Sequence, residues 1–238
     1  MAPYYRRVMT SSEATEPDAG PGPALTVGST AVIYLLDDER VLRRYREQHD
    51  LSREVEIMRH LGAHGFPVPE VFAAHDLDLE MERLHGPTLL QSLAAGETGI
   101  PEAGHLLADL HRRLHAVPPP AGERDVVVHL ALHPANVILS ERHGPVLIDW
   151  ATARTGPAEL DVAVTALIIA EVAVDEDEVE YSKAARALLA AFLAAVDGDP
   201  VSQLDAAVDI RGRDESLVPG ERALLAPAAE LVRHFCSL

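Results

Sequence analysis

The side chains that could do chemistry in this chain are concentrated in residues 129–149. His129, His133 and Asn136 fall within one short loop, and Asp149 follows the apolar run 146–148. Imidazole, amide and carboxylate groups in such a pattern could bind a metal ion or transfer a proton. A strand, a loop and a second strand would bring them together. The plainer alternative makes Asn136 a turn residue and Asp149 the cap of a strand.

This segment resembles the catalytic loop of the aminoglycoside phosphotransferase and choline kinase family, which has a protein-kinase-like fold. The family's loop reads H-G-D-x-H-x-x-N, and its metal-binding aspartate follows at a strand end in the pattern I-D-[FWL]. His129, His133, Asn136 and Asp149 stand at the expected spacing. The resemblance, over residues 25–173, implies ATP-dependent phosphorylation of a hydroxyl group on a small molecule, with Asn136 and Asp149 as Mg²⁺ ligands.

Ala131 stands where the family has its catalytic aspartate, and Leu130 replaces the preceding glycine. An alanine can neither accept a proton nor orient a hydroxyl group, and a general base contributes on the order of 100- to 10,000-fold in rate. The resemblance therefore implies nucleotide binding with little turnover. The chain would be an inactive or substrate-trapping variant, or alternatively a natural pseudokinase that binds a ligand or recruits a partner. A protein kinase is disfavoured, because the short carboxy-terminal region leaves little room to dock a peptide.

The resemblance also assigns a phosphate-covering loop to Gly28, Ser29 and Thr30, which lie between the first two expected strands. Backbone N–H groups in such a loop can face phosphate oxygens. An ordinary hairpin turn is the alternative.

Arg43 stands where most relatives have a phosphate-binding lysine, and Glu54 stands where the partner glutamate of that lysine belongs. Arginine is always charged and presents a planar fork, so Arg43 could hold both phosphate and carboxylate. Arg44 points to the opposite face of the strand and is the less favoured candidate. Glu56 in place of Glu54, or a surface salt bridge for Arg43, remains open.

Residues 80–86 resemble the family's connection between lobes. The backbone C=O of Glu82 and N–H of Leu84 would bind the adenine edge there, and an edge strand running into a turn is the alternative. Asp161 matches an acidic residue that braces the catalytic loop from the start of a buried helix. An acid at a helix N-terminus also suits the helix dipole, so both interpretations are compatible.

Twelve histidines make a zinc site worth considering. His111 and His115 lie one helical turn apart, but the glutamate of the zinc-protease pattern is absent. His129 and His133 are further candidates. No third ligand is apparent at a sensible spacing, so a zinc hydrolase is disfavoured. In the kinase-like interpretation, His129 and His133 support the catalytic loop.

The elements that must position these residues fall into two regions. Residues 25–85 predict the order β-β-β-α-β-β, with β-rich runs at 31–36 and 41–45, a helix over 50–61 and two strands within 68–82. Beyond Gly86 the pattern is helical, except for β-rich runs within 126–148. We therefore predict an α+β, two-lobed, protein-kinase-like fold, with a small antiparallel sheet in the lobe 25–85 and a helical lobe at 86–238.

Composition bears on the partners and the cellular location of the protein. The chain has 238 residues, 47% of them hydrophobic, and residues 1–24 predict a flexible leader. The net charge of −18 disfavours nucleic acids and anionic membranes and favours cationic small molecules. Cys236 is the only cysteine and no apolar run approaches the length of a membrane span, so we expect a cytoplasmic protein without disulfides, secretion signal or membrane anchor.

Overall fold

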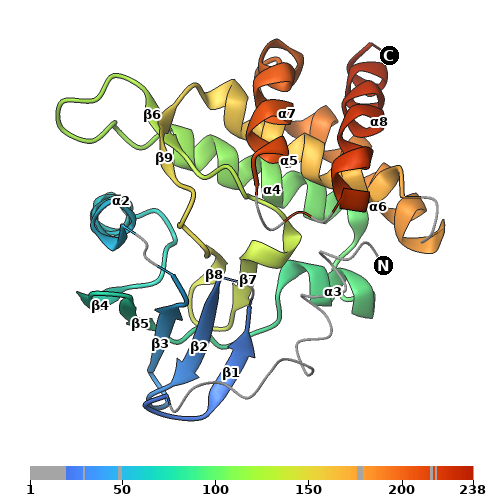
Figure 1. Cartoon of the computed structure of the whole chain (residues 1–238). Helices are drawn as coiled ribbons and strands as arrows, with labels where there is room; N and C mark the ends of the chain where they lie inside the picture. Colours follow the sequence, from blue (N-terminus) through green and yellow to red (C-terminus); the bar gives the residue numbers. More distant parts are fainter. Residues whose placement is uncertain are drawn as a thin grey trace.

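The computed structural model describes residues 20–28, 30–47, 50–175, 179–214, 217 and 219–237. Figure 1 shows an antiparallel sheet with one helix in the amino-terminal part and a bundle of helices in the carboxy-terminal part, which we call the sheet part and the helical part. Most of the predicted leader, residues 1–19, lies outside the described residues, as does Ser29.

The sheet part contains five antiparallel strands in the order β1-β2-β3-β5-β4. Strand β2 is apolar along its whole length, and β2 and β3 carry most of the buried side chains of the sheet. The predicted order β-β-β-α-β-β is confirmed. The strands are β1 (Ala24–Val27), β2 (Ala31–Leu35), β3 (Arg40–Tyr45), β4 (Val71–His75) and β5 (Asp78–Glu82).

Helix α2 (Leu51–Ala63) connects β3 to β4 and follows the expected boundaries. The carboxylate of Asp50 caps its N-terminus by accepting a hydrogen bond from the Ser52 N–H. Its buried face consists of apolar residues together with one acid, Glu54, which is only 3% exposed. A carboxylate at that depth requires a partner, and α2 therefore delivers a charged group into the interior beside the sheet.

The predicted β-rich region of the helical part forms two small antiparallel pairs. Strands β7 (Val137–Ser140) and β8 (Gly144–Leu147) make a hairpin, directly after the 3₁₀ turn η1 (Pro134–Asn136). Strand β6 (Val126–Val128) pairs with β9 (Arg154–Gly156), which the sequence did not predict because the segment Arg-Thr-Gly carries no β-rich pattern. Both loops that were expected to do chemistry therefore leave from strand ends.

Helix α5 (Ala158–Ala173) is the centre of the helical part, and every residue from 160 to 173 is buried. A helix that is apolar on all sides must be covered on all sides. Figure 1 shows α4 (Ile100–His115), α6 (Val179–Ala195), α7 (Leu204–Gly212) and α8 (Pro219–Cys236) arranged around it. The helical part also contains the 3₁₀ turn η2 (Pro200–Gln203), which contacts α5, and helix α3 (Leu89–Ala95), which contacts η1 and β7.

The connection between the two parts passes against the β7–β8 hairpin. The Leu139 N–H donates to the Pro87 carbonyl at 2.9 Å, and the Glu141 N–H donates to the His85 carbonyl at 3.0 Å. Between these bonds, Gly86 has φ 141°, and a Cβ there would lie 2.0 Å from the Leu139 carbonyl oxygen. Only glycine fits this approach. Among the described residues, no single helix is long and apolar enough to cross a membrane.

Candidate active site

The loop 129–136 is held in place by the groups around it. Leu130 adopts φ 64°, a left-handed conformation unfavourable for a residue with a Cβ. Its N–H donates a 2.7 Å hydrogen bond to Oδ1 of Asp161, which lies in the first turn of α5 and is fully buried. This bond fixes the loop against the central helix, as predicted for a bracing acid.

His129 ties the loop to the end of β8. Its Nε2 lies 3.0 Å from the Ile148 carbonyl and its Nδ1 accepts the Ala131 N–H at 3.2 Å. One ring nitrogen thus donates and the other accepts, which describes the neutral imidazole. Burial lowers the pKa of His129, in keeping with that form. The His129 ring also stands edge-on to Trp150, with the centroids 4.6 Å apart.

Asn136 is oriented by its amide nitrogen. Nδ2 donates to the Ala131 carbonyl at 3.0 Å and lies 3.2 Å from Nε2 of His133. These two contacts occupy both amide protons and leave Oδ1, the atom able to bind a cation, outside them. The Ile148 N–H donates to the Asn136 backbone carbonyl at 2.9 Å. The hairpin therefore brings Asn136 next to the residue that precedes Asp149.

Arg43 joins the sheet part to this loop. Its Nη2 donates to Oδ1 of Asp149 at 2.6 Å, across 106 residues of sequence, and its Nη1 lies 3.4 Å from Oε1 of Glu54. The predicted Arg43–Glu54 pair is present, but the shorter contact is with Asp149, which the sequence did not predict. Arg44 instead makes two 2.7 Å hydrogen bonds to Asp78, on the other face of the strand.

The Arg43–Asp149 pair keeps both groups charged. Burial alone would raise the pKa of Asp149, but the charge and hydrogen bond of Arg43 outweigh it and lower that pKa below its usual value. Burial would likewise lower the pKa of Arg43, and Asp149 raises it. The Asp149 side chain is 42% exposed, against 9% for Arg43. The carboxylate is therefore reachable from solvent while its partner is enclosed.

Tyr45 is a member of this group that sequence reasoning missed. Its hydroxyl donates to Oε2 of Glu54 at 2.6 Å, and the Arg43 guanidinium lies 4.7 Å from its ring centroid. Burial raises the pKa of Tyr45, so the hydroxyl remains a proton donor. The available signal was its position two residues after Arg43, which places both side chains on one face of β3.

Hydrogen bonds join the two sides of the predicted phosphate loop. The Gly28 N–H donates to the Ala31 carbonyl at 2.9 Å, and the carbonyls of Gly28 and Thr30 both accept from Arg46. The Gly28 N–H is thus engaged within the turn, which agrees with the alternative of an ordinary hairpin. Ser29, the middle residue of this prediction, lies outside the described residues.

The predicted adenine-binding segment follows β5. Glu82 ends that strand, and its side chain accepts from Nε2 of His143 at 2.7 Å. The next residue, Arg83, donates its N–H to the Glu39 carbonyl at 2.8 Å. Leu84 is partly buried. The structure thus places the segment between the sheet and the hairpin, and its role in binding adenine stays a prediction.

Comparison with known proteins gives one family and one fold. The model of the family described as "Phosphotransferase enzyme family" matches residues 24–125 and 119–200 of the chain. No curated protein matches the chain.

Three solved structures illustrate the shared fold. Aminoglycoside phosphotransferase APH(4)-Ia superposes with a TM-score of 0.55 and 15% identity, over 90% of this chain and 92% of its own. A choline/ethanolamine kinase family protein from Mesorhizobium loti gives 0.54 and 12%, over 99% and 95%. The ADP-bound aminoglycoside phosphotransferase APH(2'')-Ib gives 0.56 and 14%, over 88% and 91%. This likeness confirms the predicted α+β fold.

Proposed function

Since the chain belongs to the phosphotransferase enzyme family, we propose that its site is built for ATP-dependent transfer of a phosphoryl group to a hydroxyl of a small molecule. We further propose that this chain binds nucleotide with little turnover, because Ala131 supplies no catalytic base. The lobes would be residues 25–85 and 86–238, with the nucleotide between them.

The observation that carries this proposal is the 2.6 Å contact between Arg43 and Asp149. It joins a cation of the sheet to a carboxylate at the end of the β7–β8 hairpin, across 106 residues of sequence. Phosphoryl transfer needs a phosphate-binding cation and a metal-binding carboxylate close together, since catalysis rests on positive groups and metal ions that hold the phosphates.

The residues present fit Mg²⁺. The amide nitrogen of Asn136 is engaged in hydrogen bonds, so Asn136 offers its oxygen Oδ1. Asp149 offers an ionised and partly exposed carboxylate. Amide and carboxylate oxygens are the ligands that Mg²⁺ takes, usually together with phosphate oxygens and water. When bound, the ion would neutralise phosphate charge. Arg43, held beside Glu54 and Tyr45, would supply a positive charge to the phosphate oxygens.

The residue that would accept the proton of the acceptor hydroxyl is where this chain departs from the family pattern. Ala131 is partly exposed, and its backbone N–H and carbonyl are held by His129 and Asn136. The backbone at Ala131 is therefore held by hydrogen bonds on both sides, although its methyl side chain offers no base. This arrangement supports an inactive or substrate-trapping variant. The alternative is a natural pseudokinase, for which Leu130 in place of the family's glycine offers a second departure from the usual loop.

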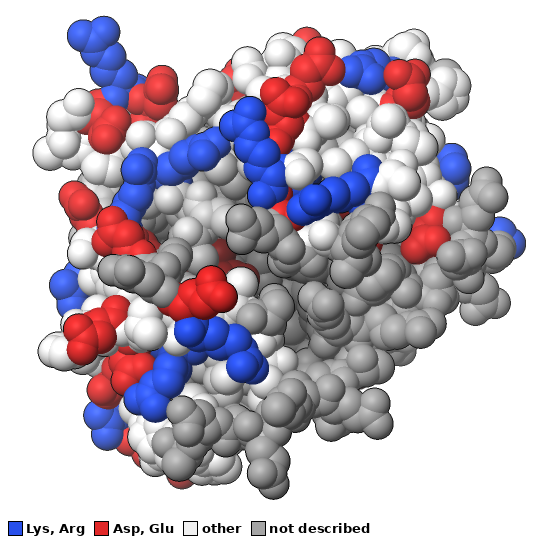
Figure 2. All heavy atoms as spheres, viewed as in Figure 1, with Lys and Arg blue, Asp and Glu red and all other residues white. Residues whose placement is uncertain are grey.

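Relatives of the same fold point to the class of acceptor. Solved structures include APH(4)-Ia with AMP-PNP and hygromycin B, and APH(2'')-IIa with gentamicin. We propose a hydroxylated, cationic small molecule for this chain as well. The net charge of −18 favours such a ligand. On the face drawn in Figure 2, acidic and basic side chains of the described residues are interspersed.

Two measurements test the proposal. Mg-ATP should raise the melting temperature of the chain, and the increase should disappear in Asp149→Ala, while ATP without a divalent cation should have a smaller effect. Ala131→Asp should then consume ATP in the presence of an aminoglycoside, macrolide, amino alcohol or nucleoside. Absence of any ATP effect on the original chain would refute the nucleotide site. A revertant that transfers nothing, while both forms bind a protein partner, would favour the pseudokinase.

A further inference from the structure

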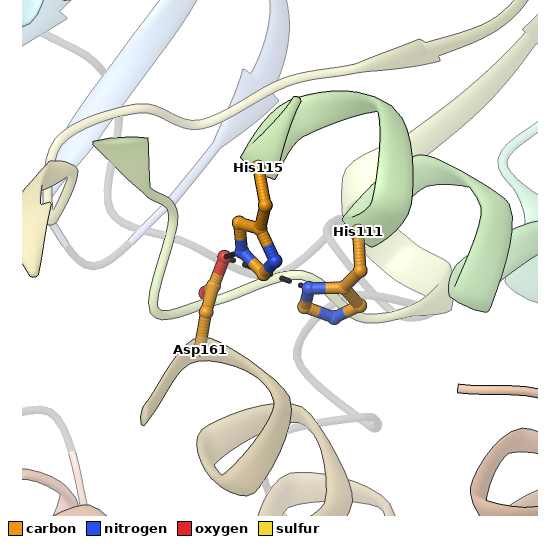
Figure 3. Close-up of side chains that lie close together, drawn as sticks. All are labelled: His111, His115 and Asp161. Atoms are coloured by element: carbon orange, nitrogen blue, oxygen red, sulfur yellow. Dashed lines mark hydrogen bonds and ion pairs between the residues drawn. The ribbon is translucent and has the colours of Figure 1, made fainter. Parts of the chain in front are cut away.

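Three metal-ligating side chains meet behind the catalytic loop, away from Arg43 and Asn136. His111 and His115 project from the last turns of α4, and Asp161 faces them from the first turn of α5 (Figure 3). One ligand atom of each residue lies within 4.8 Å of the other two. Among the described residues this is the only such cluster of histidine, cysteine and acidic groups.

The hydrogen bonds of Thr165 determine which nitrogen of His111 carries a proton. The Thr165 hydroxyl donates to the Leu132 carbonyl at 2.8 Å, which uses its only proton. His111 Nε2 lies 3.0 Å from the same hydroxyl oxygen and must therefore be the donor of that contact. In a neutral His111, Nδ1 is then left as a bare lone pair.

That lone pair has no hydrogen-bond partner although His111 is 1% exposed. Its nearest charged neighbour is Oδ2 of Asp161 at 3.5 Å, another atom that can only accept. Burial lowers the pKa of His111, which disfavours a second proton on the ring. Two facing acceptors in the interior repel each other, and such an arrangement calls for a cation between them.

His115 supplies the third atom. With no cation bound, its Nε2 donates a 3.0 Å hydrogen bond to the same Oδ2 of Asp161, and a metal ion would take the place of that proton. The His115 side chain is 14% exposed, against 0% for Asp161. The cluster is thus closed on the side of Asp161 and reachable from solvent through His115. Both ion-pair contacts of Asp161 among the described residues are to these two histidines. No arginine or lysine contact offsets its buried charge there.

We propose that His111 Nδ1, His115 Nε2 and Asp161 Oδ2 form a binding site for a divalent transition-metal ion, with Zn²⁺ as the best match. Tetrahedral zinc holds imidazole nitrogen and carboxylate oxygen at about 2.1 Å, so that two ligand atoms lie about 3.4 Å apart. The separations from Oδ2, 3.0 and 3.5 Å, bracket this value. Two nitrogens among three ligands favour zinc over Mg²⁺ or Ca²⁺.

The surroundings of the cluster are those of a metal site. Metal-ligating histidines usually donate their second N–H to a fixed oxygen, and His111 does so to Thr165. Ligating carboxylates are also hydrogen-bonded, and the second oxygen of Asp161 accepts the Leu130 N–H at 2.7 Å. The sequence pointed to His111 and His115 but offered no third ligand. The structure supplies one in Asp161, 46 residues beyond His115 and on another helix.

The proposed ion would act on the structure and not on the reaction. It would join the end of α4 to the start of α5, and through Asp161 it would hold the backbone of Leu130 in the catalytic loop. The ion would be distinct from the Mg²⁺ proposed at Asn136 and Asp149. This inference does not depend on the proposed function, since it concerns other residues and a different metal.

The test is metal binding by the full-length chain after treatment with a chelator. We expect one tightly bound Zn²⁺ per chain, a visible Co²⁺ spectrum typical of tetrahedral coordination, and a higher melting temperature with Zn²⁺. His115→Ala removes the most exposed ligand and should weaken Zn²⁺ binding by roughly 100-fold or more, since even outer-shell losses cost 10- to 100-fold. His111→Gln should have the same effect.

Two controls locate the ion. The double variant His60→Ala, His64→Ala removes another pair of neighbouring histidines, His60 at the end of α2 and His64 at its C-cap. Among the described residues, no acidic group completes a metal cluster with this pair. The double variant should leave the tight binding unchanged, as should Asp149→Asn. Equal Zn²⁺ affinity in the original chain and His115→Ala overturns the proposal. NMR detection of a doubly protonated His111 ring, with no tight zinc binding, would also overturn the proposal. It would place a proton, and not a metal ion, between His111 Nδ1 and Asp161 Oδ2.

Discussion

The contact between Arg43 and Asp149 should appear as a coupling energy in the stability of the chain. The perturbation is Arg43→Met and Asp149→Asn, made singly and together. Removing one partner of a fully buried pair costs about 3–5 kcal/mol, whereas exposed pairs contribute about 0–1 kcal/mol. Arg43 is 9% exposed and Asp149 42%. Because solvent screens the more exposed partner, we expect a coupling of about 1–2 kcal/mol, between those limits.

The assay is urea denaturation of the four proteins without nucleotide or divalent metal, with the coupling taken from the double-mutant cycle. A matched cycle on Arg40 and Glu80 serves as control. That pair is nearly as short, at 2.7 Å, but its side chains are 47% and 22% exposed and it has no role in the proposed site. A coupling for Arg43 and Asp149 no larger than that of the control pair would refute the reasoning.

The same pair should restrain metal binding. Arg43 occupies Oδ1 of Asp149, so Mg²⁺ alone must displace or share that contact. Arg43→Met should therefore strengthen the binding of free Mg²⁺ by about 5- to 30-fold, which is the coupling converted at about 1.4 kcal/mol per tenfold. It should weaken the binding of Mg-ATP, whose phosphates lose their cation. Trp150, the only tryptophan, follows Asp149 and gives the fluorescence signal for both titrations. Parallel changes in both affinities would contradict this account.

Three further outcomes are expected. Gly86→Ala should lower the free energy of unfolding by about 3 kcal/mol, because the new Cβ meets the Leu139 carbonyl oxygen. Gly122 also has a positive φ but faces open space, so Gly122→Ala should cost only about 1 kcal/mol in the same urea titration. Tyr45→Phe should cost about 1–2 kcal/mol by leaving Glu54 without its 2.6 Å hydrogen bond, and an unchanged denaturation midpoint would contradict that. Burial lowers the pKa of His133 from 6.5 to about 3, so the unfolded chain binds the proton first as the pH falls. The stability associated with His133 is thus present above about pH 6.5 and is lost toward pH 3. The loss in the free energy of unfolding is at most about 1.4 kcal/mol per pH unit. His133→Gln should reduce this pH dependence, measured by urea denaturation at several pH values.

Local patterns in the sequence were sufficient to predict the sheet part. The β-rich runs 31–36 and 41–45 predict β2 and β3, and the apolar face on residues 51–61 predicts α2. The loop 129–136 was recognisable from its motif for a similar reason, since its residues are close in sequence. In contrast, β9 has three residues without a β-rich pattern, and its pairing with β6 depends on tertiary structure alone.

The contacts that define the site could not be read from the sequence. Arg43 was expected to face Glu54, eleven residues away, and its shorter contact proved to be with Asp149. Such a contact depends on how the sheet part packs on the hairpin, which no periodicity encodes. The same holds for Asp161, which was recognised as a bracing acid but not as the third neighbour of His111 and His115. One carboxylate oxygen of Asp161 contacts the loop and the other contacts the two imidazoles. These contacts form only when α4 packs against α5.

The glycine at the junction of the two parts has a consequence for motion. Gly86 is required because a carbonyl oxygen lies against its Cα, and backbone bonds from residues 85 and 87 to the hairpin fasten the chain on both sides of it. Gly86 is therefore a packing contact and not a hinge. Any closing of the sheet over a nucleotide has to come from bending or twisting of strands β1–β5, which precede residue 83 in the chain. The hairpin that carries Asn136 and Asp149 would remain stationary, with the last residues before the helical part fixed to it.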